Sequence, residues 1–301
     1  MIYWLLVTVL AYLFFALASL GDKLVLNGKP RPNSYTFYVG IFGIFVILFI
    51  PFIEFNLPSR LGLSWIILDA LVRILGMYTM YTALEKFDVS KVVATIGATQ
   101  PIFIFILTWI FWEPQAMPII DIIAFIILLI GSIIISINKD IEITGKYLKI
   151  TIFSSLMFSL DYIFAKKVFS IQPFFQGIVW TGIFIFLFVF VFLLSKKTRK
   201  EIFAKKVVLN RKTEKAFLLA QISGGVANFL QSFAIYLAPV AFLATVNSLR
   251  GIQYVFLFLM TLSLSLFFPK VLKEELSKRI IVQKIISIVL IAVGLAMLVI
   301  Y

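Results

Sequence analysis

The sequence predicts an all-α integral membrane protein with ten transmembrane helices, arranged as two inverted five-helix repeats. Three observations lead to this fold class. Of the 301 residues, 62% are hydrophobic, well above the roughly 45–50% apolar usage of soluble domains. The apolar residues fall in runs of about 20, the length that crosses a hydrocarbon core roughly 30 Å thick. The segment "ATIGATQPI" at residues 94–102 also returns as "ATVNSLRGI" at residues 244–252.

Each apolar run is predicted to be a helix, because unpaired backbone groups are too costly in lipid even where Phe and Ile favour strands in water. The first run lacks a basic region and a cleavage site, so we expect it to be retained as the first helix. The longest connection, at residues 195–215, is strongly basic. The predicted spans are residues 2–20, 34–55, 62–84, 89–112, 117–137, 148–168, 173–195, 215–237, 239–267 and 280–301.

The repeated segment divides the chain into a first repeat at residues 1–138 and a second at residues 147–301. It lies in the fourth span of one half and the fourth span of the other. The fifth span of each half also matches, which pairs Gly131 with Gly294. Five spans per half make the second repeat enter the membrane upside down, as in transporters that alternate access by rocking one half against the other.

Residues 81–113 carry a family pattern, "YTALEKFDVSKVVATIGATQPIFIFILTWIFWE". An Ala-Leu pair ends the third span, small residues open the fourth, and Pro precedes an apolar run that ends in Glu. This pattern resembles the EamA-type repeat of the drug/metabolite transporter superfamily, and residues 234–256 repeat it. The resemblance implies the ten-helix transporter fold with both termini in the cytoplasm. It also implies an acidic residue after the pattern, which we interpret as a helix-capping group at Glu113 and at Glu274 and Glu275.

The composition excludes several classes of function. The chain has no Cys and no His, so it lacks disulfides, thiolate metal sites and the commonest general base. Its carboxylates are scattered, so we expect no catalytic residue, no metal site and no cofactor. The net charge of +13 lies mostly between the spans, where Lys and Arg set topology and touch anionic lipid headgroups. We therefore expect no nucleic-acid partner.

Lys and Arg lie mainly in the loops after the first, third, fifth, seventh and ninth spans, whereas Arg60, Lys166 and Lys167 lie on the opposite side. By the positive-inside rule this bias puts both termini outside the cell. The family resemblance implies the reverse, so the sequence leaves the orientation open.

Two positions are predicted to act as hinges. Pro101 lacks a backbone N–H and cannot close the usual helix bond, and Gly251 occupies the equivalent place in the second repeat with no side chain. The functional interpretation is a kink that exposes backbone polar groups beside the substrate. The alternative is a packing kink without a role, because Pro and Gly are common in membrane helices.

Arg250 and Asp161 are the charged residues that stand out within the spans. A charge there is costly unless it is paired or faces water. Arg250 is interpreted either as an anchor for a carboxylate or phosphate of the substrate or as an internal ion pair, for which Asp161 is the natural partner. Asp161 also admits proton coupling, since burial favours a neutral carboxyl group whereas a nearby cation favours the ionised one.

In the third span, Asp69 and Arg73 lie one turn apart. They are expected either to form a local ion pair or to line the cavity. Tyr78 and Tyr81 share a face and suit a binding wall, although Tyr also anchors helices at the membrane interface. Further polar candidates for binding or for interhelical hydrogen bonds are Asn228, Gln231, Asn247, Ser248 and Tyr254.

These features predict a multi-pass secondary transporter of the cell membrane that moves a small polar metabolite by alternating access. The first four spans of each half would surround a central cavity. The driving force is left open between a proton or ion gradient, a solute gradient and exchange, as is the oligomeric state. A lipid-linked-sugar flippase of the same fold is the alternative, followed by a membrane lipid enzyme and a membrane scaffold.

Overall fold

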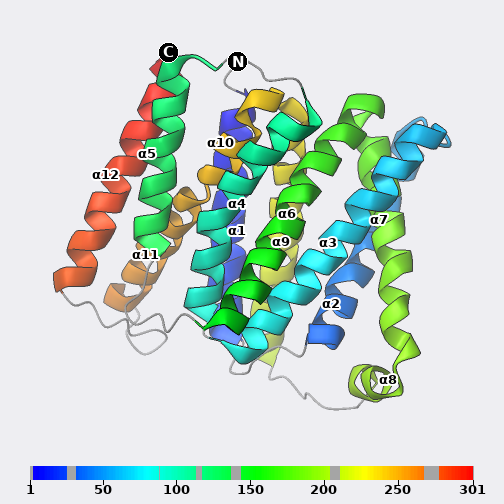
Figure 1. Cartoon of the computed structure of the whole chain (residues 1–301). Coiled ribbons are helices and arrows are strands. Elements are labelled where there is room, and N and C mark those ends of the chain that lie inside the picture. The colour runs from blue at the N-terminus through cyan, green and yellow to red at the C-terminus, as the bar shows by residue number, and fades with distance from the viewer. Residues whose placement is uncertain are drawn as a thin grey trace. The chain divides into compact units, whose positions relative to one another are not determined.

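The computed structural model describes residues 3–25, 32–87, 89–112, 117–136, 144–203, 211–267 and 278–300, and every regular element in them is a helix (Figure 1). Nine spans in these ranges are long and apolar enough to cross a bilayer, and α5 is a shorter apolar helix. The ten-span fold class is thereby confirmed. The elements are α1 (Tyr3–Val25), α2 (Pro32–Ile41), η1 (Phe42–Phe52), α3 (Arg60–Lys86), α4 (Val89–Phe111), α5 (Ile119–Ser136), α6 (Gly145–Ile171), α7 (Phe174–Val189), η2 (Phe190–Leu194), α8 (Lys196–Ile202), α9 (Arg211–Leu237), η3 (Val240–Phe242), α10 (Leu243–Ser248), α11 (Gly251–Phe267) and α12 (Lys278–Ile300).

The helices gather into two compact units that draw on both halves of the sequence. Unit 1 comprises residues 1–27, 114–139 and 208–301, and unit 2 comprises residues 28–113 and 140–207. The predicted repeats, 1–138 and 147–301, are therefore not the compact units. Repeats in sequence and units in space are different divisions of the chain, and the repeat boundaries stay a prediction.

The two units share one internal packing pattern. In unit 1, α1 packs on α9 and α11, and in unit 2, α6 packs on α3 and α4. When the spans of the two repeats are matched in order, α1 corresponds to α6, α9 to α3, and α11 to α4. Each unit therefore builds the same three-helix arrangement from opposite repeats.

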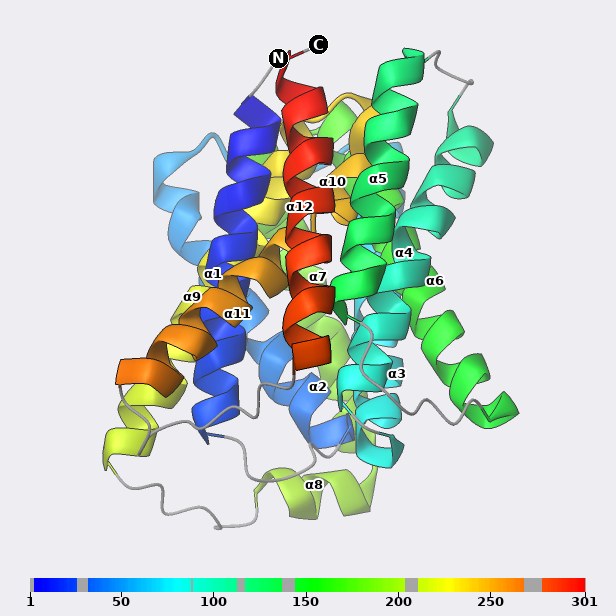
Figure 2. The same ribbon diagram turned by 90° about the vertical axis from the view of Figure 1, so that its left-hand side faces the viewer.

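The fifth spans of the two repeats, α5 and α12, lie side by side and antiparallel in unit 1 (Figures 1 and 2). A Cβ at Gly131 would lie 2.9 Å from Cγ1 of Ile291, and a Cβ at Gly294 would lie 2.7 Å from Cγ of Leu128. Each glycine thus packs against the residue that lies three positions before the other glycine, because Ile291 precedes Gly294 and Leu128 precedes Gly131. This reciprocity is a local two-fold relation between α5 and α12, as an inverted repeat requires.

The second spans of the repeats form a similar pair in unit 2. A Cβ at Gly43 of η1 would lie 3.4 Å from Cγ2 of Ile185, and a Cβ at Gly182 of α7 would collide with Val46. Here each glycine packs against the residue three positions after the other glycine, because Ile185 follows Gly182 and Val46 follows Gly43. The sequence carries the signal as "GIFVILF" at residues 43–49 and "GIFIFLF" at residues 182–188.

Hydroxyl side chains fix where several helices begin. Ser59 accepts a hydrogen bond from the backbone N–H of Gly62 at the start of α3, and Thr144 accepts one from that of Tyr147 at the start of α6. Such caps satisfy N–H groups that have no partner within the helix. Ser195 caps α8 in the same way, and this short basic helix was not predicted within the loop 195–215.

Candidate functional site

The ninth span is broken between α10 and α11, and α11 runs obliquely to α12 (Figure 2). In a continuous α-helix the N–H of Gly251 would bond to the C=O of Asn247, four residues back. Instead it donates to the hydroxyl of Ser132 on α5, over 3.1 Å between N and Oγ. The same hydroxyl donates to the C=O of Ser248 over 2.5 Å. One side chain therefore satisfies a backbone group on each side of the break.

Polar groups surround this break within unit 1. The hydroxyl of Tyr12 donates to the C=O of Val246 over 3.0 Å. Asn247 is fully buried, and neither atom of its amide has a hydrogen-bond partner among the described residues. The same holds for the buried hydroxyl of Tyr254, which interacts electrostatically with Arg250 and Tyr12. An unpaired buried polar group costs about 1–3 kcal/mol, which a ligand that bonds to it would recover.

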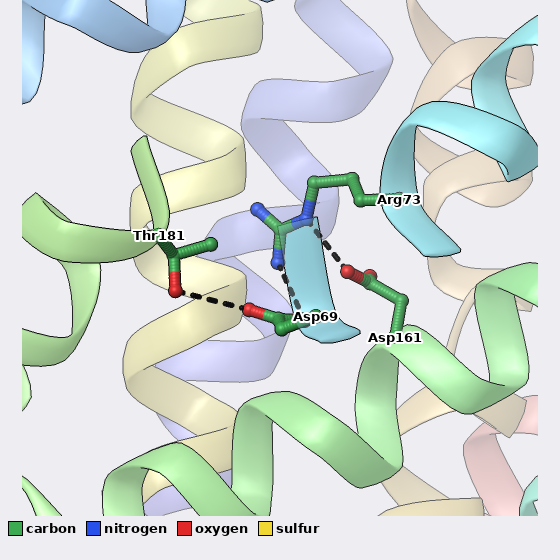
Figure 3. Close-up of polar contacts among 4 residues, drawn as sticks. All are labelled: Asp69, Arg73, Asp161 and Thr181. Carbon is green, nitrogen blue, oxygen red and sulfur yellow. Dashed lines mark hydrogen bonds and ion pairs between the residues drawn. The ribbon is translucent and has the colours of Figure 1, made fainter. Parts of the chain in front are cut away.

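Unit 2 contains a charged cluster of Asp69, Arg73, Asp161 and Thr181, in which Arg73 is half-buried and the other three residues are buried (Figure 3). The guanidinium of Arg73 on α3 reaches between two carboxylates. Its Nε lies 2.6 Å from Oδ1 of Asp161 on α6, and its Nη2 lies 3.9 Å from Oδ1 of Asp69. The hydroxyl of Thr181 on α7 donates to Oδ2 of Asp69 over 3.2 Å. The cluster ties three helices of unit 2 together with charge-assisted hydrogen bonds.

This cluster adds a partner to the pairing expected from the sequence. The local pair of Asp69 and Arg73 is present, but the closer partner of Arg73 is Asp161 on another helix. Asp161 consequently has a cation in its own unit, whereas the sequence offered Arg250 as one alternative for its partner. A hydrogen bond of 2.6 Å to a carboxylate is stronger than an ion pair at 3.9 Å, so the contact with Asp161 on α6 dominates over the one with Asp69 one turn back.

The fourth span, α4, differs from the ninth at the equivalent place. It runs without interruption through Pro101. Hydroxyls of α6 bond to its backbone, with Ser155 donating to the C=O of Ile96 over 3.4 Å and Ser159 donating to that of Gln100 over 3.2 Å. The side-chain amide of Gln100 is fully buried and has no hydrogen-bond partner within the described ranges. The hinge role of Pro101 and Gly251 stays a prediction.

The two tyrosines predicted to share a face of α3 have different neighbours. The ring of Tyr78 packs 5.6 Å from that of Phe192 on η2, and the ring of Tyr81 packs 4.7 Å from that of Tyr35 on α2. Aromatic pairs at these distances stabilise packing. That the two tyrosines form a binding wall stays a prediction.

The remaining predicted polar residues differ in burial and in hydrogen-bond partners. Asn228 is exposed on α9, and its amide donates to the C=O of Gly224 in the same helix over 2.8 Å. Gln231 is half-buried on the same helix. Ser248 is fully buried, and its hydroxyl donates to the C=O of Thr245 over 2.9 Å. Of these residues, Asn228 and Ser248 direct their side chains to their own backbone.

Sequence reasoning missed four residues of these regions and of α4: Tyr12, Gln100, Ser132 and Thr181. Ser132 and Thr181 carried no signal, because single hydroxyl residues are common in membrane helices and their partners lie far away in the chain. Gln100 did carry a signal, since it aligns with Arg250 in the repeated segment.

Within the described ranges, no group of three or more His, Cys, Asp or Glu residues is placed to hold a metal ion. The structure also has a pocket of about 290 Å³ in unit 2, which contains none of the predicted site residues. Its lining residues are Ile53, Glu54, Pro173, Phe174, Phe175 and Gln176. The predicted capping groups Glu113, Glu274 and Glu275 lie outside the described residues.

Comparisons with known proteins bear on the family. The model of the EamA-like transporter family matches residues 2–137. No curated protein matched the chain. Among the solved structures that match, a crystal structure of a protein superposes with a TM-score of 0.68 and 14% sequence identity, over 98% of this chain and 96% of that chain. At this identity the likeness shows the fold alone. The resemblance seen at residues 81–113 is confirmed: residues 2–137 match the model of the EamA-like transporter family, which is part of the drug/metabolite transporter superfamily.

Proposed function

We propose that this protein is a secondary transporter of the cell membrane that moves a small polar organic metabolite by alternating access. The family match supports transport, and the inverted repeats support the mechanism, because transporters of this kind rock one repeat against the other. The choice of a polar substrate rests on one observation beside the broken backbone of the ninth span: the amide of Asn247 is fully buried and has no hydrogen-bond partner among the residues that the structure describes.

The same region favours a substrate with an anionic group. Arg250 is half-buried at the break and interacts with Tyr254, whose buried hydroxyl has no hydrogen-bond partner in the described part of the chain. A guanidinium binds a carboxylate or phosphate with two parallel hydrogen bonds. We assign Arg250 to the anionic group, and Asn247 and Tyr254 to neutral polar groups of the same metabolite.

The test is uptake of a panel of labelled metabolites into proteoliposomes containing the purified protein. Asn247→Ala should abolish or strongly reduce uptake, while Asn228→Ala should retain it, because the amide of Asn228 is exposed and bonds to its own helix. Arg250→Ala should reduce uptake of anionic metabolites more than that of neutral ones. Circular dichroism and size-exclusion profiles would verify that each variant is folded.

Two outcomes would refute this proposal. Equal uptake by the two asparagine variants would remove the assigned role of Asn247. Failure of every water-soluble metabolite, together with movement of a labelled lipid-linked sugar between leaflets, would instead favour a flippase of the same fold.

A further inference from the structure

The charged cluster of unit 2 contains two carboxylates but a single guanidinium. Arg73 is the only cation paired with Asp69 or Asp161 among the residues that the structure describes. Asp69 is 1% exposed and Asp161 is 9% exposed. If both carboxylates were ionised, the cluster would carry one uncompensated negative charge. An unpaired buried charge is among the most expensive features of a protein interior, so the site favours one fewer charge.

The geometry distinguishes the two carboxylates. Asp161 accepts a short hydrogen bond of 2.6 Å from Nε of Arg73, as an ionised carboxylate does. Asp69 lies 3.9 Å from the guanidinium, and its Oδ1 atom has no hydrogen-bond partner within the described ranges. Its other oxygen accepts only the neutral hydroxyl of Thr181. Asp69 is therefore the group that is better suited to be neutral.

Among the described residues, the charged groups that act on Asp69 are Arg73 and Asp161. From α6, Asp161 and Tyr162 interact with the cluster, and α7 contributes only the hydroxyl of Thr181. The titratable side chains of α2 are directed elsewhere, because Tyr35 packs on another tyrosine and Tyr38 donates to the backbone of Ile202. The other titratable residues of α3 and α6, none of which is among the groups acting on Asp69, are Arg60, Tyr78, Tyr81, Glu85, Lys86, Lys146, Tyr147, Lys149, Lys166 and Lys167. On α4, the side chain of Lys91 lies outside the described part.

We propose that Asp69 is a proton-binding carboxyl group that couples transport to a proton gradient. With its proton, Asp69 is neutral and Arg73 is bonded to Asp161. When Asp69 releases the proton to water on one side of the membrane, its carboxylate attracts the guanidinium one turn away on the same helix. Arg73 then divides its hydrogen bonds between Asp69 and Asp161, which weakens the link between α3 and α6. This inference rests on the proposed transport function.

The proton itself can be measured without knowing the substrate. The probe is the infrared carbonyl band of protonated carboxyl groups, recorded on the purified protein in phosphatidylcholine vesicles over a range of pH. The wild type should show a band from a buried, protonated carboxyl, and Asp69→Asn should lose it. Thr181→Val should shift the band without removing it, because the hydrogen bond to the Asp69 oxygen is lost. Asp121→Asn on α5 is the matched control and should leave it unchanged.

Transport provides the second measurement. With a metabolite that the protein moves, an imposed proton gradient should drive accumulation by the wild type. Asp69→Asn mimics the protonated state, so it should lose this accumulation while retaining exchange of labelled for unlabelled metabolite. Absence of the infrared band, its persistence in Asp69→Asn, or accumulation driven by sodium alone would overturn the inference. A band that behaves as expected without movement of any metabolite would support the proton site and refute the proposed function.

Discussion

The break in the ninth span can be tested with a double-mutant cycle on Ser132 and Gly251. Ser132→Ala removes the hydroxyl that pairs with the N–H of Gly251 and the C=O of Ser248. Each orphaned buried group costs about 1–3 kcal/mol, although interhelical hydrogen bonds in membranes average about 0.6 kcal/mol because the chain relaxes. Relaxation is limited here, since the C=O of Asn247, to which the N–H of Gly251 would otherwise bond, already accepts from the N–H of Arg250 and from the hydroxyl of Tyr12. We therefore expect a loss of about 2 kcal/mol, within the range that two such groups allow.

Gly251→Ala perturbs the same contact from the other side. The added Cβ would collide with Oγ of Ser132 and would lie 2.7 Å from Cδ1 of Ile291. Overpacking of this kind costs about 1–3 kcal/mol. In the double variant Ser132→Ala/Gly251→Ala, the first collision is gone. The double variant should therefore be more stable than the sum of the single losses predicts, by about 1–2 kcal/mol.

The assay is equilibrium unfolding of the purified protein in mixed detergent micelles, followed by circular dichroism. Ser263→Ala is the matched control, because Ser263 lies on α11 and its exposed hydroxyl bonds only to its own helix. Additive single losses, or a loss for Ser132→Ala no larger than for Ser263→Ala, would refute the idea that Ser132 holds the break.

Three further predictions concern stability. Gly182→Ala should lower the unfolding temperature, because its Cβ would lie 2.7 Å from a backbone oxygen of η1, whereas Gly225→Ala should not, since a Cβ there has nothing within 4 Å; equal shifts would contradict the reciprocal packing. Tyr12→Phe should cost about 0.5–1.5 kcal/mol in the same unfolding assay, the net value of one hydrogen bond, and a neutral result would argue against its role at the break. Lys167→Met should destabilise the end of α4, where the ammonium bonds to a backbone oxygen at 2.8 Å and lies 4.0 Å from a tryptophan ring, while Lys149→Met on the exposed face of α6 should be neutral; similar stability of both lysine variants would contradict this.

The helices and their repetition were predictable because their causes are local. A bilayer requires long apolar runs and satisfied backbone groups, so the boundaries of the spans follow from composition. The repeat at the fourth and ninth spans was visible because both copies kept their small residues. The match between residues 43–49 and 182–188 was missed. Its two copies are not separated by the same number of positions as residues 94–102 and 244–252, because the loops of the two repeats differ in length.

The contacts of the candidate site were not predictable, because they join residues that only the tertiary structure brings together. Arg73 and Asp161 are 88 positions apart, and the sequence offered Asp69 as the partner of Arg73 and Arg250 as a partner of Asp161. The role of Ser132 had no local cause either, because its hydroxyl would ordinarily bond to its own helix. Charged residues in a span identify a site, but their pairing depends on which helices are neighbours.

The two copies of the repeated segment reach the same backbone defect by different chemistry. In α4, Pro101 has no N–H, so the hydrogen bond to the C=O of Gly97 cannot form. In the second repeat, 150 positions later, Gly251 has an N–H but donates it to Ser132, so its bond to Asn247 is missing as well. In the sequence a proline is replaced by a glycine, whereas in the structure each repeat lacks one backbone hydrogen bond of the helix at the equivalent place. Each repeat thus has a span that lacks one backbone hydrogen bond at Pro101 or at Gly251, and this gives the two predicted hinges a common physical basis.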